Sequence, residues 1–568
     1  MKRLRWQLII VFVALVVIAV LLFSQQSSKS PLIMVPAPVR GGSYTEALIG
    51  TPGRFNPTLD FNNQVDRDVD RLIFSGLVKF DDRGMPQADV AESWGISKDG
   101  TIYNFALRPN AVWHDGQPVT SDDVLFTIEL MRHPEYPMPG DLQDFWKTIE
   151  VKRLDDKTLQ FVLPESFAPF LDYLTFGILP KHKLENINPK ELVNHPFNLS
   201  PIGSGPYAFE RLVTGQNEDG STAIKGLVLR SFDKFYLQPP YIDKFMIAYY
   251  PDAISALAAY KSARVQAIGN VTQDILPQAL IEPKLNLYTS RLPKITLILL
   301  NLDNPEVPFF QDAKVRQAFL MAVNRQKIVD RLLGGQAIIA NGPIFPGTWA
   351  YYDGTPQLPY APDKAISRLK AAGYAIPADG IVRTKDTQRL AFELLYPDDP
   401  RHKAMAEMIQ TSWAAVQAEV TLKGVNNQEM IANYLSTRKY QAALVDIDLS
   451  RSPDPDPYPF WHQAQATGGQ NYSQWIDRQA SEYLEQARVI VDPLERGRLY
   501  RNFQVRFASE LPALPLFYPV YTYGIDQEVQ GVRVGPIFDP SDRLSLVTEW
   551  FLMSKGKVAE TAVPGGAP

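Results

Sequence analysis

The hydrophobic pattern of the chain changes character several times along its length. A continuous apolar run, LIIVFVALVVIAVLLF, occupies residues 8–23. Further on, Tyr103, Phe105 and Leu107 alternate with smaller or polar neighbours, which predicts a strand. The segment QDAKVRQAFLMAVNRQKIVDRLLGG instead repeats its apolar residues at helical spacing. Because strands and helices alternate in this way, we expect a mixed α/β fold.

Turn and cap residues predict where several of these elements begin and end. Asp99–Gly100 is a tight-turn signal, so ESWGIS and TIYNFALR are expected to pair as a hairpin. One helix is expected to stop at Gly334–Gly335, and another to begin with Asp492 as its cap and Pro493 in the first helical position. QAALVDIDL and PLFYPVYTYGI are predicted strands. The expected buried face of the first helix is formed by Val315, Ala318, Phe319, Ala322 and Val323.

The stretch WHDGQPVTSDDVLFT concentrates His114, Asp115, Asp122 and Asp123 within ten residues. Asp115 and the following glycine indicate a turn. The Thr-Ser pair before Asp122 can cap a helix whose first turn then carries both later aspartates. No second histidine or carboxylate lies at helical metal-ligand spacing from His114. A structural role is therefore predicted for the stretch, with His114 as a ligand or base as the alternative.

The N-terminus indicates export. Three basic residues among the first five precede the apolar run 8–23, which as a helix would be about 24 Å long against a hydrocarbon core of about 30 Å. No small-x-small cleavage site follows, so an uncleaved membrane anchor over residues 1–24 is favoured over a cleaved signal peptide. The bulk of the chain would then lie outside the cytoplasm. Residues 25–39 are typical of a linker, and residues 553–568 of a disordered tail.

Composition narrows the possible functions. A chain of 568 residues is too long for one core, so two or three domains are expected. The net charge is −5, with acidic and basic residues mixed along the chain, so a nucleic-acid partner is not expected. The chain has no cysteine, which excludes disulfides, thiolate metal sites and a lipid-bearing cysteine.

The chain lacks the common catalytic motifs, which favours binding over catalysis. The six histidines form no HxxH or HxxxH pair, and the segment IGSGPY lacks the glycine of a nucleophile elbow. No phosphate-binding lysine loop or dinucleotide fingerprint is present. We therefore expect no enzyme activity, no metal and no cofactor. The aromatic fraction of 11% leaves room for aromatic side chains in a binding cleft, although most should be core.

A series of segments, in order along the chain, resembles the extracellular solute-binding proteins of family 5, the peptide-binding and related receptors of ABC importers. The resemblance covers roughly residues 40–550. Its segments are AESWGISKDGTIYNFALRPNAVWHDGQPVTSDDVLFT, IGSGPYAFE, LNLDNPEVPFFQDAKVRQAFLMAVNRQKIVDRLLGG, SPDPDPYPFWH, GGQNYSQW, DPLERGRLY and ELPALPLFYPVYTY.

The resemblance implies the large, three-domain variant of the type II periplasmic-binding-protein fold, with the ligand in a cleft between two lobes. Lobe I would comprise residues 40–77, 198–298 and 517–552, with an inserted subdomain at 78–197. Lobe II would comprise residues 299–516. Such a receptor, expected here as a monomer, closes on its ligand by a hinge and presents it to an ABC permease and its ATPase.

One departure from the family pattern concerns the ligand. Peptide receptors of this family commonly place an aspartate before a YPDP-like motif to hold the peptide's amino group. The segment SPDPDP places Arg451 at that position, and Asp448, three residues earlier, is a further ligand-binding candidate. A guanidinium suits a carboxylate or phosphate. Arg451 is thus expected to bind an anionic ligand group, with a loop arginine balanced by Asp454 or Asp456 as the alternative.

Further ligand-binding candidates come from the same resemblance. Arg54 and Phe55 lie in the first strand–loop segment, Trp349 and Trp461 could stack on a ligand, and Tyr521 lies on the strand that returns to lobe I. Packing is the alternative role for each of them. A metal role for His462 is a further, less favoured alternative.

Two other functions stay open at this point, and a third is not supported. The receptor could bind an oligosaccharide or another organic solute in place of an oligopeptide. It could be an exported sensor or scaffold without transport. An exported hydrolase would need a nucleophile–base pair or a metal constellation, and the sequence offers neither.

Overall fold

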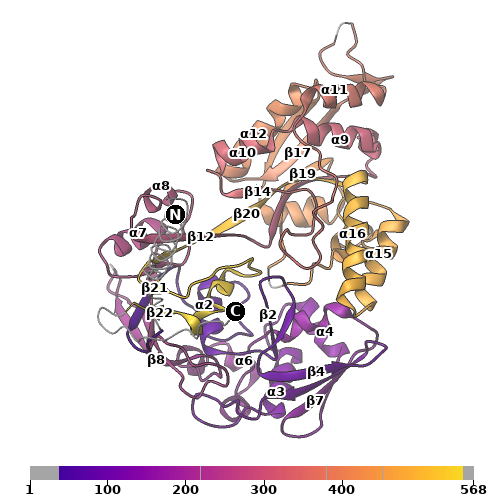
Figure 1. Ribbon diagram of the computed structural model, residues 1–568. Helices are drawn as coiled ribbons and strands as arrows, with labels where there is room; N and C mark the ends of the chain where they lie inside the picture. The colour runs from indigo at the N-terminus through magenta and orange to yellow at the C-terminus, as the bar shows by residue number, and fades with distance from the viewer. Residues whose placement is uncertain (1–37, 218, 379, 451, 554–568) are drawn as a thin grey trace, which may run out of the picture. The chain divides into compact units, whose positions relative to one another are not determined.

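The two predicted strands QAALVDIDL and PLFYPVYTYGI both belong to one large sheet. The computed structural model describes residues 38–217, 219–378, 380–450 and 452–553. Its main sheet has twelve strands in the order β18-β17-β19-β13-β20-β11-β1-β10-β9-β8, and β12 and β14 also pair with β20 (Figure 1). The strands are β1 (Ser43–Ile49), β8 (Tyr207–Gln216), β9 (Thr222–Ser231), β10 (Lys244–Tyr250), β11 (Ala267–Ile268), β12 (Leu285–Arg291), β13 (Lys294–Leu300), β14 (Ala337–Ile339), β17 (Ala391–Pro397), β18 (Glu419–Val425), β19 (Ala442–Asp448) and β20 (Ala513–Asp526).

Strand β20 joins two halves of this sheet. Its first part pairs antiparallel with β13 and β14, and its second part, from Val520 to Asp526, pairs with β12 and β11. The chain passes between the halves again at Arg291–Lys294, where β12 ends and β13 begins. Arg291 is buried there, and its Nε donates to the carbonyl oxygen of Pro346 at 2.8 Å. The two halves are therefore connected by two neighbouring segments.

The predicted hairpin at Asp99–Gly100 is confirmed, and it belongs to a second sheet. This four-stranded sheet has the order β4-β5-β7-β6, and Gly100 takes the positive φ of +71° that its turn requires. The strands are β4 (Ala91–Ile96), β5 (Ile102–Leu107), β6 (Glu150–Arg153) and β7 (Thr158–Val162). Short pairs complete the strands: β2 (Val78–Phe80) with β3 (Pro86–Ala88), β15 (Thr384–Lys385) with β16 (Gln388–Arg389), and β21 (Val529–Gln530) with β22 (Phe551–Leu552).

Helices cover the sheets, and α12 packs on β17 and β18 while α15 packs on α16 (Figure 1). The α-helices are α2 (Gln64–Ile73), α3 (Ser121–Arg132), α4 (Gly140–Thr148), α5 (Lys181–Leu184), α6 (Pro189–Leu192), α7 (Ala253–Lys261), α8 (Leu276–Ala279), α9 (Ala313–Ala322), α10 (Arg325–Leu332), α11 (Pro362–Ala371), α12 (Pro400–Ala414), α13 (Asn427–Glu429), α14 (Tyr458–Trp461), α15 (Arg478–Val489) and α16 (Pro493–Glu510). The 3-10 turns are η1 (Ala168–Leu174), η2 (Pro196–Leu199), η3 (Pro308–Gln311), η5 (Gln463–Gln465), η6 (Pro540–Leu544) and η7 (Val547–Glu549), and η4 (Met430–Leu435) is a π turn.

The cap predictions are confirmed at two helices. Asp492 caps α16, because its side chain accepts a hydrogen bond from the backbone N–H of Glu495 at 2.8 Å. Helix α3 has Thr120 as its N-cap, and the Asp123 carboxylate accepts from the Thr120 backbone N–H at 2.8 Å. The helix ends at the residue before His133, ahead of Pro134. Polar residues of this stretch thus define the ends of local elements.

His114 also has a structural place. Its Nε2 lies 3.0 Å from the carbonyl oxygen of Gly205, and its Nδ1 accepts from the backbone N–H of Gly203. Its ring packs edge-on against Phe232. Burial lowers the pKa of His114 to about 4, so the imidazole is neutral at pH 7.

The prediction of a single helix that ends at Gly334–Gly335 is wrong. The segment forms two helices, α9 and α10, because Val323 takes an extended conformation between them. The Asn324 side chain then accepts from the backbone N–H of Lys327 at 2.9 Å and caps the second helix. The predicted apolar face from Val315 to Val323 is nevertheless buried.

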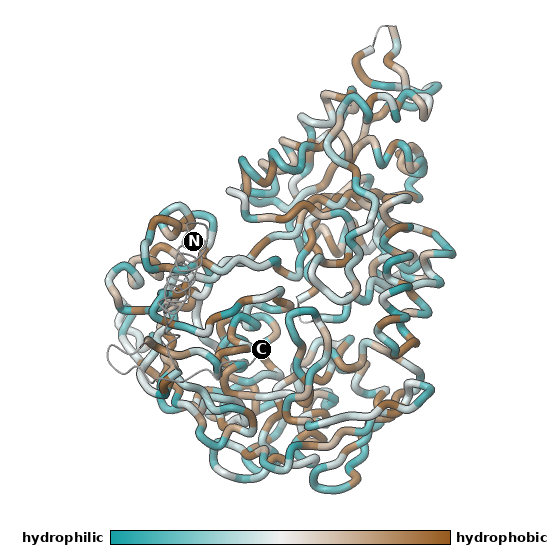
Figure 2. The backbone as a smooth tube through the Cα atoms, in the orientation of Figure 1, coloured by the Kyte–Doolittle hydropathy of each residue, from teal (hydrophilic) through white to brown (hydrophobic). Residues whose placement is uncertain are grey.

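Separate hydrophobic clusters lie along the two halves of the main sheet. One gathers Phe319, Phe392 and Trp413, and another gathers Tyr44 and Trp550. Figure 2 shows hydrophobic residues along the interior strands and hydrophilic residues on the outer turns of the helices. The α/β class expected from the alternating pattern is confirmed.

The predicted terminal segments lie outside the described residues. This applies to the anchor at 1–24, the linker at 25–39 and the tail at 553–568, apart from residues 38, 39 and 553. Within the part of the chain that the structure describes, no helix combines the length and apolar character needed to cross a membrane.

Candidate functional site

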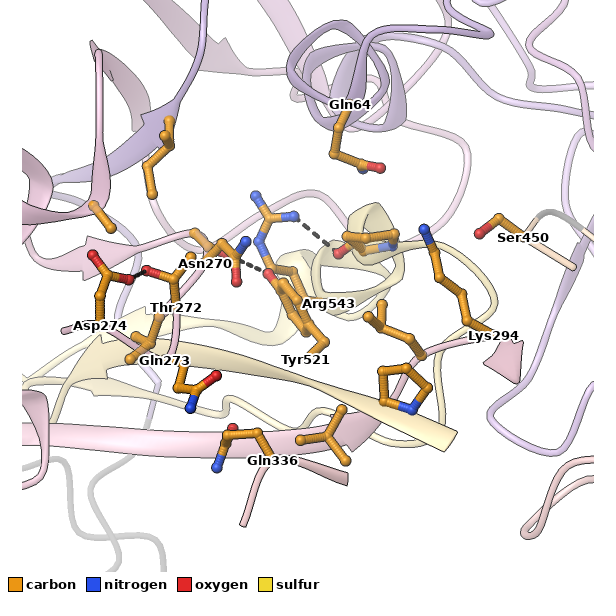
Figure 3. Close-up of a pocket in the computed structure, with 18 of the residues that line it drawn as sticks. Gln64, Asn270, Thr272, Gln273, Asp274, Lys294, Gln336, Ser450, Tyr521 and Arg543 are labelled. Carbon is orange, nitrogen blue, oxygen red and sulfur yellow. Dashed lines mark hydrogen bonds between the residues drawn. The ribbon is translucent and has the colours of Figure 1, made fainter. Parts of the chain in front are cut away.

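A cavity of about 810 Å³ is lined by both halves of the main sheet. Its lining includes the end of β1, the start of α2, the loop 269–274, the starts of β13 and α12, and residues of β20. Figure 3 shows Asn270, Thr272 and Asp274 on one side of this space and Lys294 and Ser450 on the other. Because both halves contribute, a change in their relative position would change the shape of the cavity.

A second cavity, of about 780 Å³, differs in this respect. It is lined mainly by residues 74–82, 175–177 and 533–548, and its described lining includes no strand of the main sheet. The first cavity is therefore the better candidate for a ligand site, since ligands commonly bind where two parts of a fold meet.

A buried cluster of charges forms the floor of the first cavity. The guanidinium of Arg543, 1% exposed, donates to Glu46 Oε1 through Nε at 3.0 Å and to both carboxylate oxygens of Asp68 at 2.9 Å. Glu46 also accepts from the hydroxyls of Tyr44 and Tyr523 at 2.8 and 2.9 Å. Burial raises the pKa of Asp68, and the nearby Arg543 opposes that rise. This triad of Glu46, Asp68 and Arg543 connects β1, α2 and η6.

Charged pairs of a different kind form one wall, which we call the β13–β19 wall. Lys294 and Asp448 lie directly opposite each other on β13 and β19, with Lys294 Nζ 2.7 Å from Asp448 Oδ2. Asp448 Oδ1 also accepts from the backbone N–H and the hydroxyl of Ser450, at 2.9 and 2.5 Å. Burial raises the pKa of Asp448, but the hydrogen bonds from Lys294 and Ser450 lower it below its ordinary value overall. Asp448 is therefore a carboxylate at pH 7.

The same wall continues with Asp446, two residues earlier on β19. Its carboxylate accepts from the Thr296 hydroxyl at 2.5 Å and lies 3.4 Å from Nη2 of Arg401. It also lies 3.3 Å from Nε2 of His402, whose Nδ1 is 2.5 Å from Asp399. Burial lowers the pKa of His402, but the two carboxylates raise it above its ordinary value overall. The wall thus alternates acidic and basic groups.

Two of the predicted ligand-binding residues line this cavity. Asp448 lies on the β13–β19 wall. Tyr521 lies on β20 at the floor (Figure 3). The Tyr521 hydroxyl donates to the carbonyl oxygen of Gly269, so this side chain is held against the loop 269–274. Their contact with a ligand stays a prediction.

The other predicted residues lie elsewhere. Arg54 donates through Nε to the carbonyl oxygen of Val193 at 2.7 Å, and Phe55 is fully buried in a core cluster. Trp349 packs on Tyr500 beside the guanidinium of Arg496, and Trp461, 3% exposed, packs edge-on against Phe507. None of these four is among the described residues that line the cavity. Arg451 lies outside the described residues, so its predicted role stays a prediction as well.

The sequence prediction did not include several polar residues of the cavity. Lys294 and Arg401 carry positive charge there, and Asn270 and Gln273 carry amide groups. A signal existed for Lys294, because a lysine opens the mostly apolar strand KITLILL. No local signal marked Arg543, whose partners Glu46 and Asp68 are distant in the sequence.

Among the described residues, no group of three histidine, aspartate or glutamate side chains is arranged to hold a metal ion. His462, the alternative metal candidate, has Nε2 2.8 Å from Glu485 and its ring stacked on Tyr458.

A cavity that two parts of a sheet line, with a few polar groups directed into it, is typical of proteins that bind a small ligand. The family model of the bacterial extracellular solute-binding proteins, family 5 Middle, matches residues 85–470. The chain belongs to this family of solute-binding proteins, as the ordered segments of the sequence indicated.

Relatives of known name cover almost the whole chain. A dipeptide-binding protein of Escherichia coli is 27% identical over 524 residues, which are 89% of this chain and 94% of that protein. The oligopeptide-binding protein AppA of Bacillus subtilis is 26% identical over 564 residues, covering 97% of this chain and 100% of its own.

Solved structures agree with the fold. The structure of Bacillus subtilis AppA in complex with a nonapeptide has a TM-score of 0.65 at 25% identity, covering 91% of this chain and 100% of that one. The structure of HbpA2 from Haemophilus parasuis has a TM-score of 0.78 at 22% identity, covering 90% and 100%, and supports the fold alone. The chain thus has the fold of the periplasmic binding proteins.

Proposed function

We propose that this protein is an extracytoplasmic receptor that captures an oligopeptide-like ligand in the 810 Å³ cavity and delivers it to an ABC permease with its ATPase. The observation that carries the proposal is the cavity itself, because both halves of the sheet line it. Relatives named for dipeptide and oligopeptide binding support the choice of ligand. In this proposal the protein acts as a monomer and catalyses no reaction.

The lining of the cavity favours a peptide over a sugar. Its aromatic side chains among the described residues are Phe517 and Tyr521, which are 2% and 4% exposed. They offer no open ring face of the kind on which sugars stack. Asn270, Gln273 and Gln336 instead place amide groups at the cavity, and amides pair well with peptide N–H and C=O groups.

The proposal includes hinge closure and an attachment to the membrane. The two lobes would correspond to the two halves of the sheet, and the hinge to β20 and the Arg291–Lys294 crossing. Asp448 and Tyr521 would face the ligand. The apolar run 8–23 would keep the receptor at the outer face of the membrane.

A thermal-shift screen of di- to hexapeptides and oligosaccharides tests the proposal. A ligand that binds only the folded state stabilises it by about 2.7 kcal/mol at 100 times its dissociation constant. A peptide should therefore raise the unfolding temperature selectively, and small-angle scattering should show compaction with that peptide. A selective response to a sugar alone would contradict the proposed ligand class, and peptide binding without compaction would contradict hinge closure.

A further inference from the structure

The β13–β19 wall carries two ion pairs whose partners differ in the hydrogen-bonding capacity that they leave for a ligand. Lys294 and Thr296 lie opposite Asp448 and Asp446 in one register, on the same face of the sheet. Positions two residues apart on a strand are about 7 Å apart. The two ion pairs of Lys294 with Asp448 and of Arg401 with Asp446 are therefore anchored side by side along this wall.

Asp448 has little capacity left for an ammonium group from a ligand. A carboxylate offers about four acceptor positions, and three donors already use those of Asp448. These are the backbone N–H of Ser450, the Ser450 hydroxyl and the ammonium of Lys294. A ligand ammonium would have to approach within a few ångströms of the like-charged Lys294 or displace it.

The two cations have capacity to spare. An ammonium has three donors, and Lys294 uses one of them on Asp448 while 37% of its side chain is exposed. Figure 3 shows the Lys294 ammonium directed into the open space of the cavity. Arg401 has 52% of its side chain exposed, and its contact to Asp446 is long, at 3.4 Å. A guanidinium carries five donors, so most of those of Arg401 remain available to a ligand.

The opposite wall carries the complementary charge. Asp274 and Asp252 line the cavity there, both exposed, and Figure 3 shows Asp274 across the space from Lys294. Asp252 caps α7 through one carboxylate oxygen, and Asp274 accepts from the Thr272 hydroxyl. A ligand with an anionic end and a cationic end would therefore match this cavity in one orientation.

We infer that Lys294 and Arg401 form an anion subsite that holds a carboxylate of the ligand, and that Lys294 acts as the built-in counter-ion that closes Asp448 to ammonium groups. The inference rests on the proposed function, since it assigns the polarity of a ligand in the same cavity. This subsite would select peptides by a free carboxylate, and no free amino terminus would be needed at this wall.

A retention experiment tests the subsite. The protein is incubated with an equimolar mixture of tetrapeptides in four forms: free at both ends, N-acetylated, C-amidated, and blocked at both ends. Native mass spectrometry then identifies the retained forms. The wild type should retain free-carboxylate forms over amidated forms by about tenfold or more, and N-acetylation should reduce retention less than C-amidation does. Lys294→Met with Arg401→Met should abolish this preference.

Matched variants make the test specific. Lys403→Met removes an exposed lysine that lies in α12, as Arg401 does, but that does not line the cavity. It should leave the preference for free-carboxylate forms unchanged. Asp448→Asn should preserve or increase retention of free-carboxylate forms, because it releases Lys294. If the double variant does not fold, the single variants Lys294→Gln and Arg401→Gln replace it, and each should weaken the preference for free-carboxylate forms.

A second arm uses inorganic phosphate followed by phosphorus NMR. A preference for free amino termini that Asp448→Asn abolishes would overturn the subsite and leave the peptide receptor standing. Retention of no peptide, with saturable phosphate binding that the double variant loses, would overturn the proposed peptide function and keep the subsite. If the protein retains no peptide and binds no phosphate, both the peptide function and the anion subsite are wrong.

Discussion

Two charged clusters border the same cavity, and they differ in how far water reaches them. The Glu46–Asp68–Arg543 triad is almost completely buried, with every charged side chain at most 6% exposed. The Lys294–Asp448 pair on the β13–β19 wall is 37% and 48% exposed. Both have short contacts, so distance alone does not separate them.

The difference in burial gives the two clusters different roles. A buried charge that loses its partner keeps its desolvation cost, so the triad holds β1, α2 and η6 together. An exposed pair is screened by water and contributes little to folding, so it can exchange partners with a ligand. The floor of the cavity is accordingly a structural element, while its wall is suited to recognition.

The largest expected effect comes from removing the centre of the triad. Arg543→Met should lower the free energy of unfolding by about 3–5 kcal/mol, because it leaves Glu46 and Asp68 buried without a counter-ion. Urea unfolding measures the change. The control is Arg533→Met, whose pair with Glu549 is 67% and 43% exposed and should cost at most about 1 kcal/mol. Equal losses in the two variants would remove the contrast between buried and exposed pairs.

A smaller loss is expected at a helix cap. Asp492→Ala should cost about 1 kcal/mol, because it removes the acceptor for the Glu495 backbone N–H at the start of α16. Asp492 is not among the described residues that line the cavity, so ligand retention should not change. A loss of stability as large as that of Arg543→Met would show that burial does not explain the ranking.

The wall pair should be nearly neutral for folding. Lys294→Met should change the free energy of unfolding by less than about 1 kcal/mol, because both partners are reached by water. Urea unfolding without ligand measures it. A loss of several kcal/mol would make Lys294 a structural residue and weaken its assignment to recognition.

His402 allows a test between the buried triad and the exposed wall pair, because it is 5% exposed but belongs to the wall. It faces the carboxylates of Asp399 and Asp446 and the neighbouring Arg401. Its folded-state pKa lies above its ordinary value, so its stabilising contribution is present at low pH and is lost as the pH rises through the folded pKa. The difference in unfolding free energy between wild type and His402→Gln should therefore be larger at pH 6 than at pH 8. A difference that grows with pH would have the wrong sign.

Local patterns predicted much of the fold. The Asp99–Gly100 turn, the Asp492 cap and the β19 and β20 strands follow from neighbouring residues, and all are found. The break at Val323 was not predicted, although Asn324 is a common cap residue, because the apolar spacing continues across it.

The candidate site was less predictable for a physical reason. The pairing of Lys294 with Asp448 depends on two strands meeting across the sheet, and no local pattern encodes that register. Trp349 and Trp461 were reasonable candidates as large aromatic residues, yet their side chains pack against Tyr500 and Phe507. The family resemblance indicated the class of site, and the residues of the cavity came from the tertiary arrangement.

A crystal structure of the protein with a retained peptide would show which cavity and which charged groups hold the ligand. We expect the peptide in the 810 Å³ cavity, with a carboxylate at Lys294 and Arg401 and the Arg543 triad unchanged beneath it. A peptide bound in the second cavity, along residues 533–548, or one whose amino group replaces Lys294 at Asp448, would contradict this expectation.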